Sequence, residues 1–75
     1  MTPEQVVAKV FGRNVTEIED ATSHDMLPAW DSLGHITLII ELEAAYGISF
    51  APEEALKMTD VATIKRTLHE QGVSW

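Results

Sequence analysis

The segment from Ser32 to Tyr46 constrains the fold of this chain more than any other. Apolar residues recur through it at steps of three and four, and Gly47 follows, so the pattern predicts a helix over 32–46 that ends at the glycine. The positions expected in the core are Leu38, Ile39, Leu42, Ala45 and Tyr46. A second apolar row, which begins in the first turn, consists of Leu33, Ile36 and Ile40. A small bundle cannot easily bury both sets of residues, so we expect the second row to stay exposed and to bind a partner.

Start and stop signals bracket a first, shorter helix. The run Thr2-Pro3-Glu4-Gln5 places a capping threonine before a proline, and Gln5 can close a capping box on Thr2. Gly12 marks the end of the segment. The apolar stripe consists of Val6, Val7, Val10 and Phe11. Because valine is a weak helix former, this helix is expected to depend on packing.

Residues 13–30 have no sustained periodicity and predict a long loop, with room for one turn of helix near residues 15–20. Its scattered apolar anchors are Val15, Ile18, Met26 and Leu27. The run Ile48-Ser49-Phe50 alternates but has no partner strand, so we expect an extended connector with Ile48 and Phe50 turned inward.

Two more helices complete the expected fold. A short one follows Ala51, with Pro52 near its first position, and the last is expected to begin at Thr59 as its cap and to end at Gly72. Val61, Ile64 and Leu68 give the last helix one apolar face. The sequence therefore predicts an all-α bundle of four helices, three main and one short, in a single domain over residues 1–75.

Composition narrows the class of partner. Twelve acidic residues against five basic ones give a net charge of −7, which disfavours nucleic acid and anionic membrane surfaces. The acidity favours partners with basic docking surfaces, or it serves only solubility. The longest apolar run, Leu38-Ile39-Ile40, is far too short to span a membrane, and a polar, acidic start argues against a signal peptide. With no cysteine and no disulfide, a cytoplasmic location is expected.

Trp30-Asp31-Ser32-Leu33 stands where the long loop meets the long predicted helix. Asp31 and Ser32 are both good N-caps, and a hydroxyl beside the unpaired N–H groups of a helix start can carry a phosphate. The Asp-Ser-Leu element, at the head of the second helix in an acidic four-helix chain of this size, resembles the attachment site of acyl carrier proteins. The resemblance covers nearly the full chain, from Thr2 to Gly72.

The resemblance implies a monomeric carrier without catalytic activity of its own. A 4′-phosphopantetheine arm from coenzyme A would be attached to Ser32 by a phosphopantetheinyl transferase, with Asp31 supporting that reaction. The arm would hold acyl or aminoacyl groups as thioesters and present them to loading and processing enzymes. The partners would dock on the second helix through Leu33, Ile36, Ile40 and Glu41. Acids that the family has early in that helix are missing here, which implies more apolar docking. Trp30 before Asp31 is more similar to carriers of specialised biosynthetic pathways, and a general fatty-acid role stays open.

Other chemistries fit the residues less well. Ser32, His35 and Asp31 are close in sequence, but a helix start of this kind lacks a nucleophile elbow and has little material for a substrate pocket. His24, His35 and His69 do not have metal-ligand spacing, and His24 and His69 are expected at the surface. His35 either flanks the modified serine or is a bystander. The remaining alternative is an unmodified acidic adaptor that binds a partner through the second helix.

Overall fold

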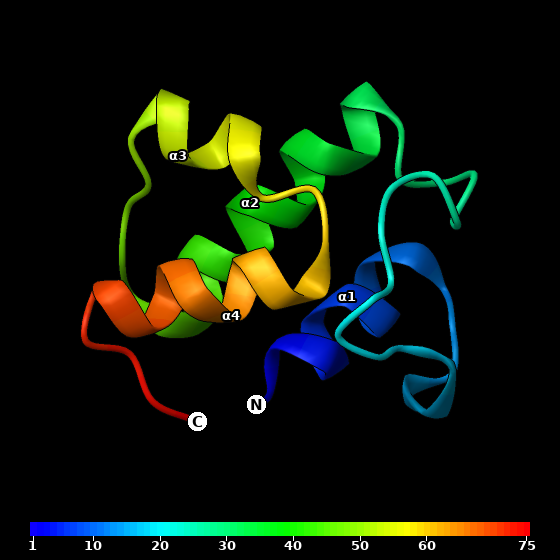
Figure 1. The fold of residues 1–75 in the computed structure, drawn as a ribbon, viewed down its shortest axis with the longest axis horizontal. Coiled ribbons are helices and arrows are strands. Elements are labelled where there is room, and N and C mark those ends of the chain that lie inside the picture. Colours follow the sequence, from blue (N-terminus) through cyan, green and yellow to red (C-terminus); the bar gives the residue numbers. More distant parts are fainter.

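The computed structural model describes residues 1–75 and shows four α-helices without a β-strand (Figure 1). The helices are α1 (Pro3–Phe11), α2 (Ser32–Tyr46), α3 (Pro52–Lys57) and α4 (Val61–Glu70), and a 3₁₀ turn, η1 (Val15–Glu17), lies in the loop after α1. The predicted all-α fold, with three main helices and one short one, is confirmed. None of these helices combines the length and apolar character needed to cross a membrane.

The helix ends follow the local signals in the sequence. The backbone N–H of Gln5 donates to Thr2 Oγ1 at 3.2 Å, and the N–H of Thr2 donates to Gln5 Oε1 at 2.8 Å, which completes the predicted capping box. Gly47 ends α2 in the left-handed region at a φ of 64°, and the N–H of Ile48 donates to the Glu43 carbonyl at 3.2 Å. A glycine is favoured there because a side chain would strain that conformation.

The core gathers apolar residues from α1, α2, α4 and the connecting segments. Its members are Val6, Val7, Ala8, Phe11, Ile18, Leu27, Trp30, Leu38, Leu42, Phe50, Met58, Val61, Ile64 and Leu68. From α2 only Leu38 and Leu42 are buried, with Ile39 and Tyr46 half-buried at the edges of that stripe. Phe50 turns inward from an extended connector and Ile48 packs against the core, as predicted. α3 contributes no buried residue.

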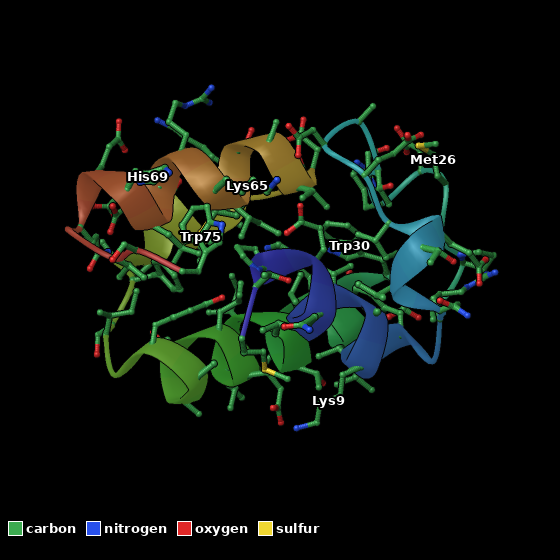
Figure 2. All side chains as sticks on the ribbon, turned by 90° about the horizontal axis from the view of Figure 1, so that it is seen from below. Lys9, Met26, Trp30, Lys65, His69 and Trp75 are labelled. Atoms are coloured by element: carbon green, nitrogen blue, oxygen red, sulfur yellow. The ribbon has the colours of Figure 1, made fainter.

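One part of the loop prediction was wrong. Ile18 and Leu27 anchor the loop in the core, but Val15 and Met26 are exposed. Figure 2 shows Met26 at the outer edge of the loop and Trp30 inside the molecule beside α1. The spacing of these apolar residues could not separate the buried anchors from the exposed residues, because an irregular segment has no period that assigns residues to a face.

Two further predictions are corrected by the structure. The N-cap of α4 is Asp60, whose carboxylate accepts from the Thr63 N–H at 2.7 Å, and Thr59 lies before the cap. Aspartate is the better cap of the two residue types, which accounts for the shift of one position. Ala45 is exposed although it shares the helix face of Leu38, because periodicity assigns a face but does not say how far neighbouring elements cover it.

Hydrogen bonds and charge tie the long loop to α4. The N–H of Val61 donates to the Thr22 carbonyl at 3.0 Å. The ammonium of Lys65 lies 2.6 Å from an Asp20 carboxylate oxygen and 2.5 Å from one of Glu4, so it joins α4, the loop and α1. The hydrogen bonds to Asp20 and then to Glu4 raise the pKa of Lys65 above its ordinary value. The loop therefore delivers residues 28–31 to the start of α2 from a fixed position.

Candidate functional site

Asp31 caps α2, and Ser32 is the first helical residue. Asp31 has an extended backbone, and its Oδ1 accepts from the Gly34 N–H at 2.8 Å. The sequence left the cap open between Asp31 and Ser32, and the structure assigns it to Asp31. Ser32 Oγ is thereby left out of the cap, and the residue is exposed. An exposed hydroxyl thus stands at the positive end of a 15-residue helix, where a negatively charged group is favoured.

Gly34 allows the loop to cross closely over the first turn of α2. A methyl group at this position would overlap the backbone carbonyl oxygen of Ala29 and would lie 3.0 Å from Phe11 Cε1. From the sequence, a glycine in the first turn only weakens the helix, by about 0.5–1 kcal/mol relative to alanine. The structure shows its use, because only a residue without a side chain leaves room for the Ala29 backbone and Phe11 against the first turn of α2.

Trp30 and His35 form a hydrogen-bonded chain that reaches α3. The indole N–H of Trp30 donates to His35 Nδ1 at 2.9 Å, and His35 Nε2 lies 2.7 Å from the carbonyl oxygen of Ala55. The Trp30 ring also stacks on Phe11, at a centroid distance of 5.2 Å, and lies nearly parallel to the His35 ring, whose centroid is 6.3 Å away. Trp30 is 3% exposed, so its N–H needs a partner inside the protein. His35 therefore joins the buried Trp30 at the start of α2 to the backbone of α3.

A pocket of about 520 Å³ opens beside Ser32, between the start of α2, α3 and the long loop. The residues that line it are His24, Trp30, Asp31, Ser32, His35, Ile36, Leu56 and Thr59. Buried Trp30 and half-buried His35 form its floor, whereas exposed Ile36 and Leu56 stand at its rim. Sequence reasoning missed Leu56, because one leucine in a short helix carries the same signal as a core residue.

The row Leu33, Ile36 and Ile40 is exposed, at fractions between 57% and 73%. Two residues correspond to about 200° of helix rotation, so Ile36 and Ile40 point almost directly away from buried Leu38. Leu56, at 76% exposure, extends this apolar surface from α3. Glu41 lies 3.7 Å from Lys9 and so also faces α1.

The site holds little charge. The stretch Ser32–Ile40 contains no acidic residue, lysine or arginine, and Asp31 is the one carboxylate that lines the pocket. His24 and His69 are both exposed, His24 beside Asp25 and His69 against the Trp75 ring (Figure 2). The structure brings together no group of three or more histidine, aspartate or glutamate side chains that could hold a metal ion.

Sequence comparisons with models of known protein families and with curated proteins give no match to this chain. Its function must therefore be argued from the site itself.

Proposed function

We propose that this chain is an acyl carrier protein that bears 4′-phosphopantetheine on Ser32. The observation that carries the proposal is the position of Ser32: exposed, first in α2, and free of the capping role that Asp31 fills. A phosphodiester on Ser32 Oγ would lie next to the helix N-terminus, a location worth about 0.3–1 kcal/mol to an exposed anion. The thiol that thioester chemistry requires would arrive with the arm, since the chain has no cysteine.

The surroundings of Ser32 also support the proposal of a carrier protein. The pocket and the exposed row from Leu33 to Ile40 give a partner enzyme an apolar surface next to the serine. Because the stretch from Leu33 to Ile40 carries no lysine, arginine or acid, and Asp31 is the one carboxylate of the pocket, we expect docking to depend mainly on apolar contact and to change little with ionic strength. The cargo in this proposal is an acyl or aminoacyl group, held as a thioester and passed between enzymes by the tethered arm.

Intact mass tests the proposal directly. The protein is incubated with coenzyme A, Mg²⁺ and a broad-specificity phosphopantetheinyl transferase, and one arm should be added. Ser32→Ala should abolish the addition, whereas Ser49→Ala, which removes an exposed hydroxyl from the connector between α2 and α3, should leave it complete. No addition to the unaltered protein, or addition to Ser32→Ala, would refute attachment at Ser32.

The second candidate is an unmodified acidic adaptor, and the exposure of Leu33, Ile36 and Ile40 is the observation that favours it. Both candidates predict that a charge in this row harms binding and spares the fold. Transfer rate and melting temperature are measured for Ile36→Glu, with Ala45→Glu as control on the other face of α2. A slower rate for Ile36→Glu alone supports carrier docking, whereas equal rates place the row outside the transferase interface.

A further inference from the structure

α3 is held to the rest of the protein by few contacts. It has no buried residue; Ala55 packs against the core, while the neighbouring Leu56 is exposed. Two hydrogen bonds join its residues to side chains elsewhere. One is the 2.7 Å contact between the Ala55 carbonyl and His35 Nε2, and the other is a longer one of 3.4 Å from Gln71 to Glu54. Phe50 before α3 and Met58 after it are buried in the core, so both ends of the helix are anchored, and His35 makes its shortest polar contact with α2.

The hydrogen-bonded chain requires one form of the His35 ring. An indole N–H can only donate, so the Nδ1 atom that faces Trp30 must present a lone pair. The proton of the neutral ring is then on Nε2, which donates it to the Ala55 carbonyl. Both ring nitrogens are thus used, one toward the floor of the pocket and the other toward α3.

We propose that His35 is a positioning residue, a latch that holds α3 against α2 and sets the width of the pocket beside Ser32. The latch connects the two walls of that pocket, because Ile36 follows His35 on α2 and Leu56 follows Ala55 on α3. When the bond to Ala55 is absent, α3 loses its closest polar tie and Leu56 moves away from Ile36. The effect of this movement on arm transfer rests on the proposed function of Ser32, whereas the latch itself does not.

The unaltered protein offers the first test. Nitrogen NMR should show His35 as the neutral form with its proton on Nε2. The indole N–H of Trp30 should exchange with solvent much more slowly than that of Trp75, whose side chain is partly exposed and outside the chain of bonds. A proton on Nδ1, or equal exchange of the two indoles, would overturn the latch.

Two variants separate the hydrogen bonds from the ring. His35→Phe keeps an aromatic ring but has no nitrogen, and His35→Gln keeps an acceptor and a donor without the ring. In His35→Phe the backbone amides of α3 should exchange about five- to tenfold faster, while those of α4 keep their protection. His35→Gln should restore part of the protection. Unchanged exchange in α3, or an equal loss in α1 and α4, would contradict the proposal.

The same variants test the link to arm transfer. With the Asp31 cap and Ser32 unaltered, His35→Phe should raise the KM of the transferase for this protein and leave kcat nearly unchanged. An unchanged KM alongside a loosened α3 would refute the claim that the latch shapes the surface read by the transferase. If the unaltered protein accepts no arm, the proposed function fails, and the exchange measurements still decide the latch. Should His35→Phe not fold, the ring-nitrogen spectra of the unaltered protein decide it.

Discussion

Replacing Gly34 by alanine should destabilise the protein, although the same change in an open helix stabilises it. In a solvent-exposed turn, glycine to alanine gains about 0.5–1 kcal/mol through backbone entropy. At Gly34 the new methyl group would overlap the Ala29 carbonyl and press on Phe11. Overpacking typically costs about 1–3 kcal/mol, and the upper end applies because a backbone oxygen cannot rotate aside as a side chain can.

The two effects give a net loss of about 2–2.5 kcal/mol for Gly34→Ala. For a domain of this size, each kcal/mol lowers the melting temperature by about 4–8 °C, so a drop of about 8–20 °C is expected. Far-UV circular dichroism follows thermal melting, and urea unfolding gives the free energy of unfolding. The urea midpoint should fall with an unchanged slope.

The matched control is the reverse change in the same helix. Ala44→Gly alters an exposed position of α2 and should cost about 0.5–1 kcal/mol from helix propensity alone. Both variants are therefore expected to be less stable than the parent protein. Gly34→Ala adds a methyl group where there is no space, whereas Ala44→Gly loses helix propensity at an open position. A Gly34→Ala protein with a raised melting temperature would show that the loop does not cross α2 as closely as described.

Two further predictions concern the core and the cap of α4. Leu42 has no exposed surface, so Leu42→Ala should lower the free energy of unfolding by about 2–5 kcal/mol in urea. Leu33→Ala, at an exposed position, should change it by no more than about 0.5 kcal/mol. Equal effects would mean that the wrong face of α2 was placed inside. Hydrogen bonds from the side chain and backbone of Thr63 hold the pKa of Asp60 below its ordinary value of 3.8. The unfolded chain therefore takes up this proton first, and Asp60 contributes stability that is present above pH 3.8 and is lost as the pH falls through the lower folded value. Asp60→Asn, which can still cap, should melt with a weaker acid dependence than the parent, and identical pH profiles would exclude this contribution.

Much of the fold was predictable because its signals are local. The capping box at Thr2 and the glycine stop at Gly47 each depend on residues within a few positions, and both appear where the sequence places them. The bounds of α2 and the burial of Leu38 and Leu42 followed from periodicity. Predictions that depend on neighbouring elements were less accurate. Ala45 and Met26 were expected to be buried, but no neighbouring element covers Ala45, and Met26 lies on the outside of the loop.

At the candidate site, the sequence by itself determined that a serine stands at the head of a long helix after an irregular loop, with an apolar row beside it. Only the tertiary structure decided that Asp31 takes the cap, that Gly34 admits the backbone at Ala29, and that His35 joins Trp30 to Ala55. His35 and Ala55 are 20 residues apart and carry no shared pattern, because a single hydrogen bond between distant segments leaves no period in the sequence. Periodicity and capping reflect geometry within one helix, whereas the pocket arises where α2, α3 and the loop meet, and their meeting depends on the packing of the whole core.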